Sequence, residues 1–114
     1  EWDERGVKKG VEYAILSNEI TEAWSGLSVK NYKNLKGLKK ENLRDNMSNL
    51  ELVLNMLAEA TTTEISKEKQ PETFDENKII AKQGGTVAGN ARKEIEEKTG
   101  KKVVSKLSAK NLLD

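Results

Sequence analysis

Six basic side chains between positions 30 and 44 are the residues best suited to binding chemistry. They are Lys30, Lys33, Lys36, Lys39, Lys40 and Arg44. Clustered cations of this kind can contact the phosphates of nucleic acid, and only Glu41 opposes them in the run. The run offers a single aromatic ring, Tyr32, for base stacking, and the net charge of the whole chain is only +1. A solvated helical face is therefore the favoured interpretation, and a nucleic-acid patch is the alternative.

Acidic, amide and hydroxyl side chains between positions 55 and 64 could do a second kind of chemistry. Asn55, Glu59 and Thr62 could form a polar pocket, and Glu59 and Glu64 are the carboxylates that an acid–base mechanism would use. Threonine hydroxyls inside a helix more often bond to the carbonyl four residues earlier, so plain packing is favoured. The sequence has no His and no Cys, which excludes a Ser-His-Asp triad, a thiolate nucleophile and the usual zinc or iron sites. We expect a protein that is not an enzyme and has no catalytic residue, cofactor or metal site.

Small residues recur every four positions late in the chain, with an arginine beside them. They are Ala81, Gly85 and Gly89, followed by Arg92. On a helix they form a smooth groove into which another helix backbone can settle, either from the same chain or from a partner. Each glycine inside a helix costs about 1 kcal/mol relative to alanine, so the glycines need a structural reason. The other interpretation is a break, in which Gly84 ends one helix and Thr86 caps the next.

The only long run with dense apolar residues at helical spacing, from Ser48 to Lys69, has to position these groups. Its apolar residues fall on one face at steps of three, four and seven: Leu50, Val53, Leu54, Leu57, Ala58 and Ile65. Ser48 and Glu51 have the spacing of a capping box, which marks the start of the helix. The apolar face is too wide for a single neighbour, so several helices are expected to surround it. We expect Leu54 and Leu57, at its centre, to be fully buried.

Other helices are predicted around this one. They run over about 18–24, from Ser28 to Gly37, over Lys39–Met47, and from Thr73 or Asp75 to Gly100. Val11–Leu16 is rich in strand formers and could pair with Lys102–Ser105 as a minimal two-stranded β element. The same residues also continue a helical stripe, so both interpretations stay open. The predicted fold is mainly α, a compact bundle of about four to five helices around a long central helix.

The length and composition indicate one soluble domain. At 114 residues the chain can bury a single core, and we predict a lead-in or linker over 1–10, a helical domain over 11–105 and a tail over 106–114. No apolar run approaches the roughly 20 residues of a membrane-spanning helix, so we expect a cytoplasmic protein without a membrane partner. Because the chain begins at Glu1 without Met, we expect an excised domain whose N-terminal part is missing.

Four stretches of the sequence carry a family resemblance. They are GVEYAILSNEITEAW, KGLKKENLRDNM, LELVLNMLAEATTTEIS and AKQGGTVAGNARKEIEEKTGKKVVS. Together they resemble the C-terminal region of bacterial and prophage proteins of the BRO type, the antirepressor-like family that includes DNA-damage-inducible protein D. The resemblance spans roughly Gly10 to Ser105. It implies an N-terminal BRO domain associated with DNA binding, followed by this region as a partner or regulatory module, and it supplies no catalytic residues.

Two functions follow as expectations. The favoured one is a non-enzymatic C-terminal interaction or regulatory domain that binds a protein partner or itself, in a prophage or DNA-damage setting. The alternative is a direct nucleic-acid-binding module that uses the patch between Lys30 and Arg44, or nucleic-acid contact through the missing N-terminal domain.

Overall fold

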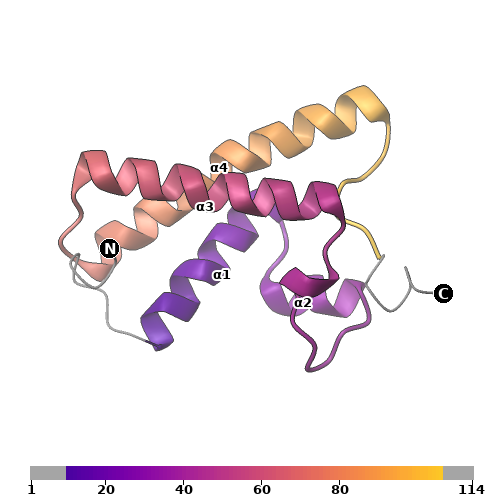
Figure 1. Cartoon of the computed structure of the whole chain (residues 1–114), viewed down its shortest axis with the longest axis horizontal. Coiled ribbons are helices and arrows are strands. Elements are labelled where there is room, and N and C mark those ends of the chain that lie inside the picture. Colours follow the sequence, from indigo (N-terminus) through magenta and orange to yellow (C-terminus); the bar gives the residue numbers. More distant parts are fainter. Residues whose placement is uncertain (1–9, 107–114) are drawn as a thin grey trace.

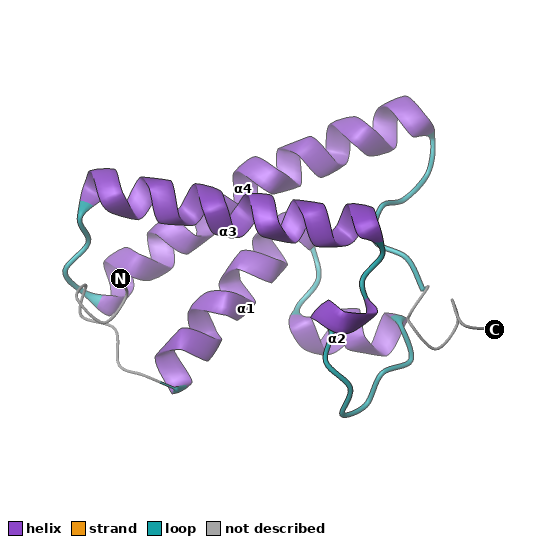
Figure 2. Cartoon of the chain, viewed as in Figure 1, coloured by secondary structure: helices purple, strands orange, loops and turns teal. Residues whose placement is uncertain are grey.

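The computed structural model describes residues 10–106, and this part of the chain is built from helices (Figures 1 and 2). The elements are α1 (Val11–Ser25), α2 (Val29–Leu35), the 3₁₀ turn η2 (Arg44–Asn46), α3 (Asn49–Lys69) and α4 (Phe74–Thr99). In Figure 1, α3 crosses α4, while α1 lies below them and α2 lies beside η2. α4 packs against both α1 and α3. The prediction of a mainly α fold around a long helix is confirmed.

Helix α1 begins directly after Gly10, seven residues earlier than predicted. The strand considered over Val11–Leu16 is therefore wrong, and residues 10–106 contain no strand to pair with it. Leu16, Ile20 and Trp24 recur every four residues and all are buried, so the helical period outweighs the strand propensity of the first residues. The helix ends at Gly26, whose positive φ allows the left-handed C-cap conformation.

The segment after α1 is less helical than predicted. Ser28 caps α2 by accepting a hydrogen bond from the Asn31 N–H, as the sequence indicates. The helix predicted over Lys39–Met47 is mostly wrong, because only the three residues of η2 turn there. Leu38 and Leu43 are the buried apolar residues that anchor this connection to the core.

Helix α3 begins with the predicted capping box: Ser48 accepts from the Glu51 N–H, and the Glu51 side chain accepts from the Ser48 N–H. Its buried face differs from the predicted one and consists of Glu51, Leu54, Asn55, Ala58, Thr62 and Ser66. Leu54 is buried, as expected, but Leu57 is 39% exposed, so that prediction is wrong. The inward side of α3 is thus formed largely by polar residues, while some of the apolar residues predicted to be buried face solvent.

Helix α4 runs without interruption from a Thr73 cap to Gly100. The break considered at Gly84 is wrong, because Gly84 and Gly85 are both buried inside the helix, where other backbones approach them. The core lies where α1, α3 and α4 meet, and Tyr32 of α2 completes it. Trp24 and Tyr32 meet edge to face there, with ring centroids 6.1 Å apart.

Two further findings bear on the predicted organisation. No helix within residues 10–106 is long and apolar enough to cross a membrane. The predicted lead-in over 1–10 and tail over 106–114 lie almost entirely outside the described residues, so those domain limits remain predictions.

Candidate functional site

The outward side of α3 carries a cluster of exposed apolar side chains, which we call the outer face. It consists of Leu50, Val53, Met56 and Leu57, whose exposed fractions are 40%, 57%, 51% and 39%. Seven large apolar residues are exposed in the described part of the chain, and these four lie on consecutive turns of one helix. Single exposed apolar residues are normal, but a contiguous patch of them indicates an interaction surface.

A buried polar network fixes the rotation of α3 that creates this face. Glu51 is fully buried, and its Oε1 lies 2.8 Å from the Nζ of Lys36. The Tyr32 hydroxyl donates a hydrogen bond to the other carboxylate oxygen. Burial and then the hydrogen bond and charge of Glu51 raise the pKa of Tyr32 far above its usual value, which keeps the hydroxyl protonated as a donor.

A second buried polar contact lies one turn further along α3. The indole Nε1 of Trp24 donates to the Oδ1 of Asn55 at 3.0 Å, and Asn55 is only 6% exposed. Leaving either group unpaired in the core would cost about 1–3 kcal/mol, so Asn55 has to face inward. With Glu51 and Asn55 both turned toward the core, Val53 and Met56 are turned toward solvent.

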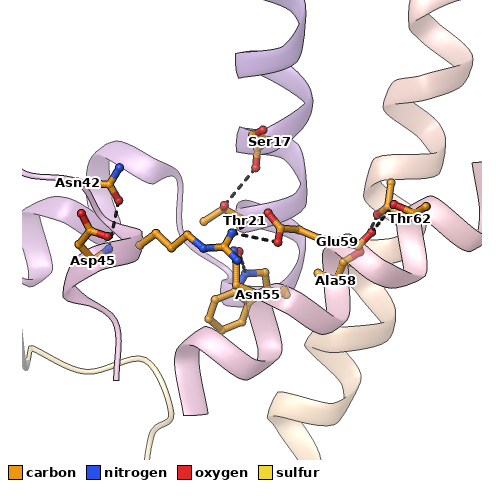
Figure 3. Close-up of polar contacts among 11 residues, drawn as sticks. Ser17, Thr21, Asn42, Asp45, Asn55, Ala58, Glu59 and Thr62 are labelled. Carbon is orange, nitrogen blue, oxygen red and sulfur yellow. Dashed lines mark hydrogen bonds and ion pairs between the residues drawn. The ribbon is translucent and has the colours of Figure 1, made fainter. Parts of the chain in front are cut away.

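The polar residues considered as a pocket on α3 are only partly brought together. Thr62 is buried, and its hydroxyl donates back to the Ala58 carbonyl at 2.8 Å, the packing role favoured from the sequence (Figure 3). Glu59 instead reaches the surface, where both of its oxygens accept from Arg44 Nη1 at 3.0 and 2.9 Å. Thr62 therefore packs inside the protein, while Glu59 takes part in a surface ion pair.

The six cations of the predicted nucleic-acid patch have different environments. Lys30, Lys39 and Lys40 are exposed, and Lys33 is half-buried. The Lys36 side chain is fully buried against Glu51, and Arg44 is paired with Glu59. Two of the six positive charges are thus already matched by carboxylates of α3, which leaves a weaker positive surface than the sequence indicates.

Helix α1 of the same chain occupies the groove predicted on α4. A methyl group added to Gly85 would lie 2.5 Å from the Ala23 Cβ, and one added to Gly89 would lie 2.8 Å from the Ala23 carbonyl oxygen. Ala81 is fully buried in the same region. A partner helix could enter this groove only by displacing α1, so the groove packs the protein's own core.

Arg92 closes the end of this α1–α4 contact. Its Nε donates to the Trp24 carbonyl at 2.7 Å, and its Nη1 lies 2.9 Å from the Glu96 carboxylate. Glu96 also accepts from the Val103 N–H at 3.0 Å. Burial alone would raise the pKa of Glu96, but the hydrogen bonds from Val103 and Arg92 and the nearby positive charges outweigh it and lower the pKa.

The apolar pattern did not predict the outer face, because it placed Leu50, Val53 and Leu57 in the core. The apolar period of α3 is compatible with more than one rotation of the helix. The capping box is the local signal that distinguishes these rotations. Glu51, at its third position, is on the same side of α3 as Asn55 and Ala58 and on the opposite side from Val53.

The fold and this surface define a small all-α domain whose described part exposes apolar area on α3. A family model described as the DinD C-terminal domain matches residues 2–110. The chain therefore belongs to the family of C-terminal domains of DNA-damage-inducible protein D, which confirms that part of the resemblance seen in the sequence. No curated protein and no solved structure matches the chain.

Proposed function

We propose that this domain is a non-enzymatic interaction module of a DNA-damage-response protein, and that the outer face of α3 binds a protein partner or a second copy of the chain. The observation that supports the proposal is the outer face itself. Four large apolar side chains stay exposed on one helix, although four of the six buried residues of that helix are polar. A protein partner would remove this apolar area from water, which stabilises a complex.

The size of the outer face sets a limit on what it can do alone. Covering four half-exposed aliphatic side chains would stabilise a complex by roughly 3–6 kcal/mol. Association costs about 4–15 kcal/mol in lost freedom of motion, so further contacts beside the outer face are needed for a stable complex.

The competing functions have less support. Direct nucleic-acid binding would use the predicted patch, but Lys36 and Arg44 are already paired with carboxylates. Acid–base catalysis would need neighbouring carboxylates in a pocket, whereas Glu59 is paired with Arg44 and the Glu64 side chain is 74% exposed. Glu59 and Glu64 also lie about 140° apart around the helix axis, because they are five residues apart.

The experiment that tests the proposal compares capture of proteins by the wild-type chain and by a Val53→Asp, Met56→Asp double variant, from cells before and after DNA damage. Ile79→Asp is the matched control, because Ile79 is 58% exposed on α4. We expect a protein, or a second copy of the chain, to be recovered with wild type and the control and lost with the double variant. Equal recovery with all three, with circular dichroism showing each folded, would contradict the proposal.

A further inference from the structure

A cavity of about 380 Å³ opens beside the outer face, where α1, α2, the η2 region and α3 come together. Asn55 and Glu59 line it from α3, Thr21 lines it from α1, and Lys33 lines it from α2. Its volume is at the lower end of the range for sites that hold a small molecule or a single side chain. Figure 3 shows Thr21 and Asn55 in the middle of this region, with Asn42 on one side and Glu59 on the other.

Asn55 supplies the cavity with a hydrogen-bond donor that no described residue satisfies. Because an indole N–H can only donate, the amide oxygen of Asn55 has to face Trp24, and this fixes the position of the amide nitrogen. That nitrogen makes no hydrogen bond to a residue within 10–106, and Asn55, which lines the cavity, is only 6% exposed. The nitrogen is not one of the fully buried polar atoms without a partner, so a ligand oxygen in the cavity can reach it and accept its hydrogen bond.

The charges around the cavity favour an anion. Lys33 lines it, is half-buried and has no acidic partner among the described residues. The other two charged groups that line it, Arg44 and Glu59, neutralise each other at 2.9 Å. The lining therefore carries one positive charge without an acidic partner among the described residues, together with the amide donor of Asn55.

The other residues that line the cavity favour a carboxylate ligand over a phosphate ligand. Four of the remaining lining residues are apolar, namely Ile20, Val29, Leu43 and Met47, and four are neutral and polar, namely Ser17, Asn18, Thr21 and Asn42. The apolar part suits the methylene groups of an acidic side chain, and the single unpaired charge of Lys33 matches the one negative charge of a carboxylate better than the higher charge of a phosphate.

We propose that this cavity binds the carboxylate of an acidic side chain, presented by a segment of a protein partner, with Lys33 Nζ and Asn55 Nδ2 as donors. The inference rests on the proposed function and supplies the polar contact that the outer face needs. Asn55 and Met56 are neighbours in the sequence, about 100° apart around α3, so one segment can cover the outer face and reach the cavity.

The probe for this site is a blocked glutamate residue, N-acetyl-glutamate N-methylamide, titrated into the isotope-labelled chain to tens of millimolar and followed by the side-chain amide signal of Asn55 in NMR spectra. We expect a saturable shift with a dissociation constant on the order of 1 mM, the affinity expected of so small a ligand. Blocked glutamine and inorganic phosphate are the comparison ligands. Both should bind at least about tenfold more weakly, because the first lacks the charge and the second carries more negative charge than Lys33 matches.

Two variants test the donors. Lys33→Gln should weaken binding of blocked glutamate about tenfold, while Lys93→Gln, an exposed lysine on α4, should leave it unchanged. Asn55→Asp keeps an oxygen for Trp24 to bond and replaces the donor by a repelling oxygen, so it should abolish binding. If Asn55→Asp does not fold, Lys33→Gln still tests the site. Lys33 makes no hydrogen bond or ion pair with a described residue, so its replacement should leave the fold intact.

The outcomes separate this inference from the proposed function. A missing shift, equal binding of blocked glutamine, or no effect of Lys33→Gln would overturn the carboxylate site, even if the Val53→Asp, Met56→Asp variant still loses its partner. Tighter binding of phosphate than of blocked glutamate would overturn it in favour of a phosphate-binding site. Saturable binding that depends on Lys33, together with unchanged capture by the outer-face variant, would support the cavity and contradict the outer face.

Discussion

The Nζ of Lys36 lies 2.8 Å from the Oε1 of Glu51, and both side chains are fully buried between the end of α2 and the first turn of α3. The same carboxylate accepts hydrogen bonds from the Tyr32 hydroxyl and the Ser48 N–H. One buried acid therefore joins the two helices and caps the second one. This arrangement holds α3 in the rotation that turns its outer face toward solvent.

We expect Lys36→Met to destabilise the protein by about 3–5 kcal/mol, because it leaves the Glu51 charge buried without its counter-charge. The double variant Lys36→Met, Glu51→Gln should lose less than Lys36→Met alone, since the unpaired charge is then gone. Urea unfolding followed by circular dichroism measures both losses. Additive losses in the double variant would show that the two side chains do not depend on each other.

The two central leucines of α3 should respond very differently to truncation. Leu54→Ala removes a buried side chain, 2% exposed, and should cost about 2–5 kcal/mol. Leu57→Ala removes a side chain that is 39% exposed and should cost less than about 1 kcal/mol. The free energies of unfolding of the two variants, compared with wild type, test the rotation of α3. Equal losses would mean that Leu57 is buried as well and that the outer face is smaller than described.

Gly85→Ala should destabilise the protein by about 1–3 kcal/mol, because the added methyl group would lie 2.5 Å from the Ala23 Cβ and 2.8 Å from the Ile20 carbonyl oxygen. The loss should not change with protein concentration, since α1 and α4 belong to one chain. Asn90→Ala, at an exposed position of α4, is the control and should change stability by no more than about 0.5 kcal/mol. A gain in stability from Gly85→Ala would contradict the close packing of α1 on α4.

Glu96 should make the protein sensitive to acid. Its pKa is lowered in the folded state, so the stability it contributes is fully present above the unfolded carboxyl pKa of about 4.3 and is lost as the pH falls through the lower folded value. Unfolding at pH values from 6 down to about 3 should therefore show a smaller acid-induced loss for Glu96→Gln than for wild type. Parallel curves for the two proteins would show that the contacts with Arg92 and Val103 do not hold the carboxylate ionised.

The sequence predicts the local features of this fold well because their causes are local. The Ser48–Glu51 capping box and the Gly100 end of α4 depend on residues within one or two turns, and the structure confirms them. The inward side of α3 depends instead on Lys36 and Trp24, which reach Glu51 and Asn55 from other helices. An apolar period cannot anticipate such distant polar partners.

In the candidate site, too, features with local causes are predictable from the sequence and features that depend on distant residues are not. The spacing of Gly85 and Gly89 correctly indicates a helix-packing surface, yet spacing cannot tell whether the helix against it belongs to the same chain or to a partner. The basic run is visible in the sequence, but the pairing of Lys36 with Glu51 and of Arg44 with Glu59 spans fifteen residues and appears only in the folded chain. The cavity that Lys33 and Asn55 line depends on the meeting of three helices and was not predicted.

Site-specific photo-crosslinking in living cells tests the proposed role of the outer face most directly. A photoreactive amino acid replaces Met56 on the outer face or, in the matched control, Ile79 on α4, and both positions are more than half exposed. We expect irradiation after DNA damage to join the chain to another protein, or to a second copy of itself, from position 56 and not from position 79. Adducts from position 79 alone, or the absence of a protein adduct from position 56, would contradict it.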